Sequence, residues 1–559
     1  TFGEPTAEQS HFFETSVRPL LAKRCYECHS GQAKTLMGGL RLDGRGHAVV
    51  GGDSGPAIVP GQPDDSLLVE SVRWESYEMP PKGKLPDSEI ATLAKWIEMG
   101  APWPNDQSSV TRANEEHPDN YDWEALQAGH WAFRPVVKPE PPAVANGAWV
   151  KDELDRFVLA RLESAGLAPS PPAEPRVLVR RIYYDLIGLP PSPEQFDAFN
   201  AAWKEDPEAA VRELVDELLA SPHYGEHWGR HWLDVARYSD GQGGFLDSAA
   251  LPHAWRYRDW VVESLNRDMP LEKYEKQQIA GDLLVDGHEG RVATGFFALG
   301  PTYKSDGGDP DSAAQAKSET LDDRVDTLTR GLLGLTVSCA RCHDHKFDPI
   351  PQQDYYSLAG VFNNSRGEVL PYAPADLVQA YSEQQNEINK RQQQINNERS
   401  RIKKEKREPT DDEATQLAAW QAEVEALRKA LPPKFPEVHA LIETGSSDMR
   451  VAIRGNLRKP GEVAQRRLPL IIAGEDAPLF NRGSGRRQLA ETIASTDNPL
   501  LSRVFVNLVW MHHFGRALVR TPSNFGKLGE EPTHPQLLDW LASVFVAGDW
   551  SIKQLHRTI

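Results

Sequence analysis

The four cysteines of the chain lie in two boxes of the same spacing, and each box ends in a histidine. The boxes consist of Cys25, Cys28 and His29, and of Cys339, Cys342 and His343. Cys-x-x-Cys-His is the attachment signature of c-type haem, in which the thiols form thioethers with the porphyrin and the histidine binds the iron. Since the boxes use every cysteine, the sequence predicts two covalently bound haems and leaves no cysteine for a disulfide.

Two other chemistries use paired cysteines. One Cys-x-x-Cys can be a thioredoxin-like redox pair, and two such pairs can bind zinc. Neither requires a histidine directly after the second cysteine, so the sequence favours haem at both boxes. At the second box a zinc site stays open as the alternative, because His345 follows His343 by two residues and adds a fourth candidate ligand.

The first haem needs a second axial ligand from the segment that follows its box. Met79 is the best candidate, because two prolines come directly after it and restrict the backbone there. Ligation by His29 and Met79 would give a relatively high potential, which suits an electron acceptor. His47 is the second choice of ligand. The structural alternative is that Met79 fills a gap in the core, as most methionines do.

A third group of reactive side chains lies between the two boxes. It consists of His223, His227, His231, Trp228, Trp232, Asp234 and Arg237. The three histidines are four residues apart, so a helix places them on one face. His231 is predicted to be the residue nearest the second iron, either as its ligand or as a base beside an open position. With Asp234, Arg237 and His345, it is a candidate for proton handling. The alternative is a surface helix with stacked aromatic rings.

The elements that must position these groups are mainly helical. Residues 8–104 are predicted to form a class I-like cytochrome c domain, because helical apolar spacing leads into the first box and a Gly- and Pro-rich loop follows it. Residues 105–150 are polar and Pro-rich and are predicted to be a linker. Residues 151–365 are predicted to form a helical domain that holds the second haem.

Beyond the second box the pattern changes twice. Residues 376–431 show heptad spacing in two arms around Pro409, which predicts an antiparallel coiled-coil hairpin. Such an arm suggests docking to a partner or to a second copy of the chain, and folding back on its own protein is the open alternative. Residues 435–475 predict a small β module. Residues 485–559 predict a C-terminal helical segment that is incomplete at Ile559.

Charge and composition exclude some classes of function. The formal net charge is −19, which argues against a nucleic-acid-binding surface. The sequence contains no run of 18 or more apolar residues, so it predicts no transmembrane segment. Because covalent haem attachment in bacteria occurs outside the cytoplasm, we expect a periplasmic or otherwise exported protein. The acidic segment 306–311 is compatible with calcium but matches no complete calcium loop, so a plain acidic turn is the alternative.

The motifs together resemble the planctomycete-type multidomain cytochrome c family. The first box and the later Glu78-Met79-Pro80-Pro81 resemble its cytochrome module. The central module is matched by Asp155-Arg156-Phe157, Gly188-Leu189-Pro190-Pro191, His231-Trp232-Leu233-Asp234 and the stretch from Gly334 through the second box to Ile350. Asn498-Pro499-Leu500 and the segment from Asn507 to Gly526 resemble the start of its C-terminal module. The resemblance implies architecture and haem but no defined substrate.

The sequence therefore predicts an exported dihaem c-type cytochrome that is an oxidoreductase or an electron-transfer subunit with a redox partner protein. The first haem would be a relay, and the second would be the reactive centre or a second relay. The many tryptophans suggest a carbohydrate-derived substrate. The alternatives are a non-catalytic electron conduit or scaffold, and a monohaem protein with zinc at the second box.

Overall fold

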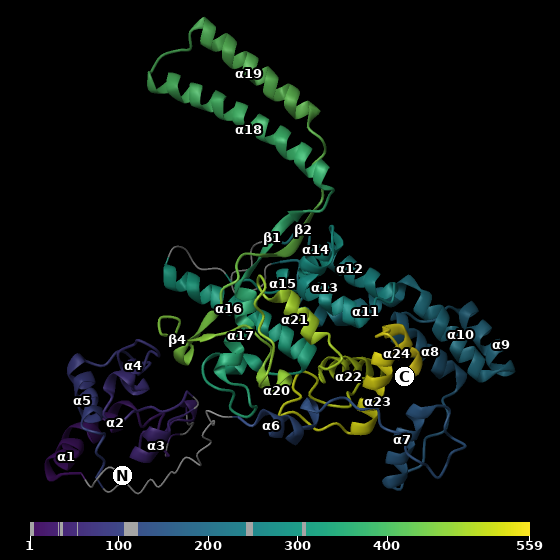
Figure 1. Ribbon diagram of the computed structural model, residues 1–559, viewed down its shortest axis with the longest axis horizontal. Helices are drawn as coiled ribbons and strands as arrows, with labels where there is room; N and C mark the ends of the chain where they lie inside the picture. Colours follow the sequence, from purple (N-terminus) through teal and green to yellow (C-terminus); the bar gives the residue numbers. More distant parts are fainter. Residues whose placement is uncertain are drawn as a thin grey trace.

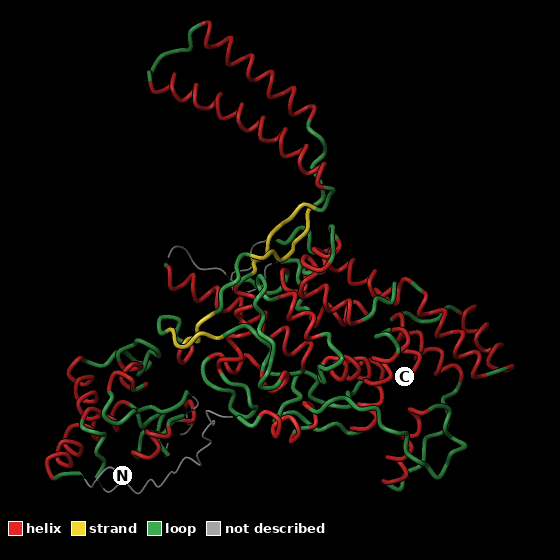
Figure 2. Tube along the Cα trace, viewed as in Figure 1, coloured by secondary structure: helices red, strands yellow, loops and turns green. Residues whose placement is uncertain are grey.

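Three separate apolar cores organise the computed structural model of the chain (Figure 1). The structure describes residues 5–559 except 32, 34–36, 53, 105–120, 242–249 and 304–308. The described chain is mainly helical, with two small antiparallel sheets (Figure 2). Among the described helices, none has both the length and the apolar character needed to cross a membrane.

The first core belongs to the cytochrome-like region. Its elements are α1 (Ala7–Phe12), η1 (Phe13–Val17), α2 (Arg18–Arg24), η2 (Met37–Gly39), α3 (Arg45–Val50), η3 (Pro63–Asp65), α4 (Leu67–Val72) and α5 (Asp87–Glu98). The centroid of the Phe13 ring lies 4.5 Å from that of Trp103 and 5.8 Å from that of Trp96. The first and last segments of the cytochrome-like region therefore pack together in one aromatic cluster. Arg24 and Glu89 form a two-bonded ion pair that joins α2 to α5. The first box is thereby held between the two ends of the domain.

The second core is the largest and runs from Trp123 to Leu555. Up to the second box and just beyond, its elements are α6 (Trp123–Gly129), η4 (Trp131–Phe133), α7 (Glu153–Ser164), α8 (Pro175–Ile187), α9 (Pro193–Glu205), α10 (Pro207–Ala220), α11 (Pro222–Val235), α12 (Trp255–Asn266), α13 (Leu271–Leu284), α14 (Glu289–Ala293), α15 (Gly295–Ala298), α16 (Pro310–Leu328), η5 (Thr329–Leu333), η6 (Val337–Arg341) and α17 (Gln352–Asn363). The helix starts follow from local sequence. Ser192, Asp206 and Ser221 each cap a helix whose first residue is proline.

The C-terminal helices pack into this same core and do not form a core of their own. They are α20 (Leu470–Ala473), α21 (Arg486–Ile493), α22 (Leu501–Phe514), α23 (Pro535–Ala547) and α24 (Ile552–Thr558). The range 105–150 also contributes to it, because Trp123 and Phe133 are buried there. The part of the predicted linker that the structure describes is thus anchored by its aromatic side chains. Its residues 105–120 lie outside the described residues.

The third core lies in a projecting arm formed by α18 (Ala375–Lys404) and α19 (Asp411–Ala430) (Figure 1). The two helices pack through Ile388, Ile395 and Val424. Thr410 and Glu413 form a capping box that starts α19, which explains why the chain turns there. At its base, β1 (Ser365–Pro371) pairs with β2 (Glu437–Glu443), with Ser365 opposite Glu443.

A second hairpin consists of β3 (Met449–Ala452), η7 (Ile453–Gly455) and β4 (Pro460–Ala464). The predicted β module of residues 435–475 is therefore divided, because β2 pairs with the distant β1 and only β3 and β4 pair with each other. Residues 453–459 at the tip of this hairpin, which we call the bridging loop, extend toward the cytochrome domain (Figure 1).

Candidate functional site

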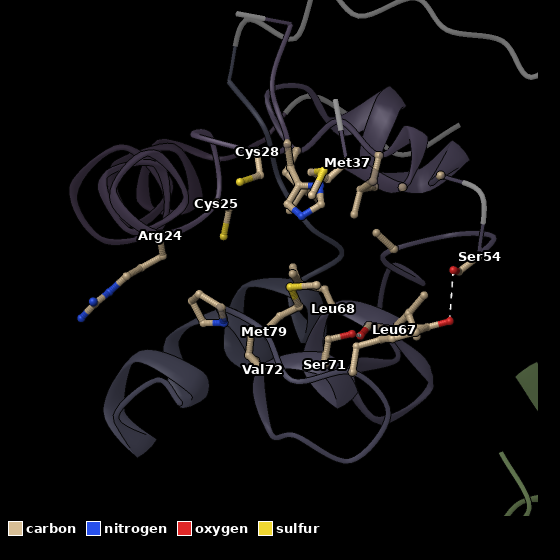
Figure 3. Close-up of a pocket in the computed structure, with 18 of the residues that line it drawn as sticks. Arg24, Cys25, Cys28, Met37, Ser54, Leu67, Leu68, Ser71, Val72 and Met79 are labelled. Atoms are coloured by element: carbon tan, nitrogen blue, oxygen red, sulfur yellow. Dashed lines mark hydrogen bonds between the residues drawn. The ribbon is translucent and has the colours of Figure 1, made fainter. Parts of the chain in front are cut away.

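The first box opens into an apolar cavity of about 260 Å³ within the cytochrome domain. It is lined by Arg24, Cys25, Cys28, His29, Met37, Gly38, Leu40, Leu42, Gly52, Ser54, Gly55, Ala57, Leu67, Leu68, Ser71, Val72, Tyr77, Met79, Pro80 and Pro81. Figure 3 shows Cys25 and Cys28 on one side of this space and Leu68, Ser71 and Met79 on the other. His29 and Met79, the predicted ligand pair, thus line one cavity.

Short-range bonds hold Met79 on its wall. Its amide donates to the carbonyl of Ser71 at 3.2 Å, and its own carbonyl accepts from the indole of Trp74 at 3.2 Å. Met37 lies on the same side as Cys28 and donates its amide to the Cys28 carbonyl (Figure 3). Met79 therefore faces the box across the cavity, whereas Met37 extends from the box side. His47 is not among the lining residues.

Polar contacts close the rim of the cavity. The hydroxyls of Ser54 and Tyr77 lie 3.2 Å apart, as the dashed line in Figure 3 marks. Lys82, which follows the two prolines, pairs with Glu27 inside the box at 2.8 Å. The loop that carries Met79 is thereby tied back to the segment that carries the cysteines.

The residues around the first box fit a c-type haem. Burial raises the pKa of the Cys25 thiol to about 12, so the free thiol is protonated. The buried Nδ1 of His29 has no hydrogen-bond partner among the described residues. An apolar space with two free thiols, an imidazole and a thioether facing it suits a flat apolar cofactor with an axially ligated metal.

The second box lies at the surface of the central module. Cys339 and Cys342 are both exposed, and the box begins within η6, where that turn packs against α16 and α17. The carbonyl of Arg341 accepts from the Gln352 amide at 2.8 Å and from the Tyr356 hydroxyl at 3.1 Å. These bonds fix the box backbone although its thiols are open to solvent.

The tautomer of His343 also fits iron ligation. Its Nδ1 lies 2.6 Å from the backbone carbonyl of Asp344, and a carbonyl only accepts, so Nδ1 carries the proton. In a neutral imidazole this leaves the Nε2 lone pair free for a metal. The second box thus presents two accessible thiols and one imidazole whose Nε2 lone pair is free to bind a metal.

His345 is engaged inside the protein. Its Nε2 lies 3.0 Å from the Thr336 hydroxyl, and its Nδ1 accepts from the amides of Phe347 and Asp348. Because both ring nitrogens are used, His345 has no lone pair left for a metal or for proton transfer in this arrangement. Within the described chain, no three His, Cys, Asp or Glu side chains converge on one possible metal position.

The predicted histidine face exists on α11, and its neighbours come from the C-terminal helices. The His231 ring stacks on His512 with centroids 3.7 Å apart, and His227 lies 5.3 Å from His231. Nearby, His513 and His556 are joined by a 2.8 Å hydrogen bond. Burial, followed by the neighbouring histidines, lowers the pKa of His231 to about 4. His231 thus belongs to a neutral histidine cluster between α11, α22 and α24.

The other residues of that segment are mostly structural. Arg237 pairs with Asp323 and with Asp326, and both carboxylates belong to α16. Trp228 and Trp232 are buried core side chains, so they do not form an open wall for a sugar ring. Asp234 is exposed on α11.

Of the acidic segment 306–311, residues 306–308 lie outside the described residues. Asp309 caps α16 by accepting from the amides of Asp311 and Ser312, and Asp311 pairs with Arg458. Both carboxylates therefore already have partners within the chain.

Sequence reasoning missed two features of the sites. The first is the contact of α11 with the C-terminal histidines, in which His512 stacks on His231 while His513 and His556 pack on Trp228. The His512-His513 doublet was the visible signal. The second is the bridging loop, which contacts the cytochrome domain through Lys459 and Glu70. No local pattern marks that contact, because 389 positions separate the two residues.

Comparison with known families assigns three parts of the chain. Residues 25–83 match planctomycete cytochrome C, residues 153–367 match a protein family of unknown function (DUF1549), and residues 485–559 match another of unknown function (DUF1553). No curated protein and no solved structure matches the chain.

Proposed function

We propose, from the premise that this chain belongs to the planctomycete-type multidomain cytochrome c family, that it is an exported dihaem electron-transfer protein. The observation that carries the proposal is the apolar cavity with the first box on one side and Met79 on the other. A c-type haem bound there supplies reversible one-electron chemistry at iron. The protein would hold it through thioethers from Cys25 and Cys28 and through His29 and Met79.

The chain's own residues would set the properties of this first site. The apolar lining excludes water, and exclusion of water together with a thioether ligand favours a relatively high potential. The Lys82–Glu27 pair and the Trp74 indole would keep the Met79 loop in place. The first site would therefore be an electron relay without an open position for substrate.

The second haem would be attached through Cys339 and Cys342 and bound by His343. The bond from His343 Nδ1 to the Asp344 carbonyl supports this, because it orients the ring and leaves Nε2 free. An external redox partner protein would exchange electrons with the exposed box. The projecting arm of α18 and α19 would serve docking to such a partner or to a second copy of the chain.

A count of attached haems tests the proposal directly. The intact mass should exceed that of the polypeptide by two haems, about 1.2 kDa, as thioether attachment at both boxes requires. The reduced protein should show the absorption of a c-type haem at two equivalents per chain. One haem with a stoichiometric zinc ion would contradict the dihaem assignment and restore the zinc alternative.

A second candidate function is catalysis at the second box by an oxidoreductase. The exposure of both thiols favours it, because a small substrate, including a carbohydrate-derived one, could reach a haem there. His231 and Asp234 of α11 would then be the proton-handling residues, since Arg237 and His345 are held in structural bonds. Binding of carbon monoxide or cyanide to only one of two haems would support it. If neither iron binds carbon monoxide or cyanide, catalysis at the second box is contradicted and electron transfer remains the proposed function.

A further inference from the structure

The bridging loop contacts the cytochrome domain through two basic side chains. Lys459 Nζ lies 2.5 Å from the Glu70 carboxylate, and Arg454 approaches the same oxygen at 3.9 Å. Arg454 also donates to the backbone carbonyl of Asp65 at 3.4 Å. Glu70 is only 6% exposed, so this carboxylate is enclosed where the two modules meet.

The same loop contacts the second box on its other side. A Cβ at Gly455 would lie 2.6 Å from Cys342 Sγ, and Gly455 has a φ of +73°, so only glycine fits here without strain. Gln352 donates both to the Arg341 carbonyl in the box and to the Ala452 carbonyl at the start of the loop. The box and the loop are therefore parts of one bonded unit.

Glu70 stands on the helix that forms a wall of the first cavity. Four other residues of α4, Leu67, Leu68, Ser71 and Val72, line that cavity. In Figure 3 they lie on the side opposite Cys28. The order in space is thus first cavity, α4, bridging loop, second box.

We propose that the bridging loop is an electrostatic docking surface whose partner is the chain's own cytochrome domain. Its basic side chains hold α4 on one side while Gly455 packs on Cys342 on the other, so that the loop places the two haem sites for an electron to pass between them. With a haem at each box, that transfer would oxidise a ferrous iron at one site and reduce a ferric iron at the other, without forming or breaking a bond. The external redox partner supplies or removes the electron. The electron-transfer half rests on the proposed function, whereas the docking half does not.

Carbodiimide crosslinking tests the docking half, because it joins a carboxylate to an amine only when they are in contact. At low salt we expect a Glu70–Lys459 peptide link by mass spectrometry. The Lys82–Glu27 pair at 2.8 Å is the internal positive control. A Lys82–Glu27 link without a Glu70–Lys459 link at low salt would overturn the proposal.

Charge variants identify the pair that holds the contact. Lys459→Gln and Glu70→Gln should each abolish the link and increase the radius of gyration in small-angle scattering. Lys390→Gln removes one charge from the exposed face of α18 and should change neither. The double variant Glu70→Lys with Lys459→Glu should restore the compact form. Unchanged scattering in both single variants would show that other contacts hold the domain.

The electron-transfer half is tested in the fully loaded protein. A rapid-mixing reduction should show the two haems equilibrating at least several-fold more slowly in Lys459→Gln than in Lys390→Gln. Electron paramagnetic resonance should show weaker magnetic coupling between the two irons in Lys459→Gln. If the Glu70–Lys459 crosslink forms but the rate of electron equilibration between the haems is unchanged in Lys459→Gln, the loop only joins the two domains. That result would overturn its redox role. A haem count of one would refute the proposed function while the crosslinking result still stands.

Discussion

The two Cys-x-x-Cys-His boxes have the same residues at the same spacing, yet the protein surrounds them differently. Cys25 lies against an apolar cavity that raises the pKa of its thiol to about 12. Cys339 and Cys342 lie exposed on a short turn, and partial burial of the Cys342 thiol raises its pKa above the ordinary value. The first box faces a methionine across an enclosed space, and the second faces solvent on one side and the bridging loop on the other.

The two surroundings predict different properties for a haem attached at each box. Iron potential depends on the axial ligand, on burial and on hydrogen bonding around the site. An enclosed site with a thioether ligand favours storage and relay of an electron. A surface site gives faster contact with a partner or a substrate. The same five-residue motif can therefore carry complementary tasks within one chain.

Replacing each pair of cysteines tests the difference between the two boxes most directly. Cys25→Ala with Cys28→Ala should cost one haem, about 0.6 kDa of intact mass. It should also empty the cavity and lower the melting temperature of the cytochrome domain by more than about 4–8 °C, the shift that roughly 1 kcal/mol makes in a domain of this size. Cys339→Ala with Cys342→Ala should cost the same mass. Because those thiols are exposed, it should leave the melting temperature nearly unchanged.

Mass spectrometry and calorimetry on the two double variants give the outcome. Equal loss of melting temperature in both would show that the second box also encloses its cofactor. No mass loss on removing the second pair would show that haem is attached only at the first box.

Replacing Met79 sharpens the contrast at the first site. Met79→Ala should lower the potential of that haem by a sizeable part of the roughly 0.8 V range that axial ligands cover. Met37→Ala is the matched control, since Met37 also lines the cavity but extends from the box side. Potentiometric titration with absorbance detection separates the two haems. A potential that falls in Met37→Ala and holds in Met79→Ala would reverse the ligand assignment.

Sequence reasoning could predict those features of the molecule that depend on residues close together in the chain. The boxes, the position of Met79 after the first box and the helical character of residues 151–365 depend on neighbours within a few turns. Met79 stands out in the sequence because two prolines follow it. The start of α9, in contrast, was not predicted, although Ser192 and Gln195 cap it reciprocally. The mainly helical class and the cytochrome c domain follow from the same local signals.

Long-range contacts explain what the sequence could not supply. The sequence made His345 a candidate for proton handling, and for zinc in the alternative, whereas in the structure the Thr336 hydroxyl and the amide of Asp348 occupy its two ring nitrogens. Strand β2 pairs with β1 across the whole arm, and no period-two pattern identifies its partner. Residue type alone does not distinguish a catalytic arginine from one that bonds two aspartates on another helix.

Arg237 tests that last distinction. Arg237→Leu leaves Asp323 and Asp326 of α16 without their shared partner, and burial already raises the pKa of Asp323. We expect a loss of about 1–3 kcal/mol in the free energy of unfolding, as for other charged hydrogen bonds, with both haems retained. Arg230→Leu, at an exposed position of α11, is the control and should be neutral. Unchanged stability with an altered second-haem spectrum would instead assign Arg237 to the second site.

The histidine cluster predicts the smallest effect, a pH dependence confined to the central module. Burial lowers the pKa of His231 and of His513 to about 4, and it lowers that of His556 well below its ordinary value. Between about pH 6.5 and 4 the unfolded chain therefore binds more protons than the folded chain, so stability is present above pH 6.5 and is lost as the pH falls toward 4.

His556→Phe keeps a ring against Trp228, 4.2 Å away, and cannot be protonated. It should flatten the fall in melting temperature between pH 7.5 and 5.0, whereas His223→Phe, at an exposed position of α11, should retain the wild-type slope. Equal slopes in all three proteins would show that α24 does not depend on neutral histidines for its packing.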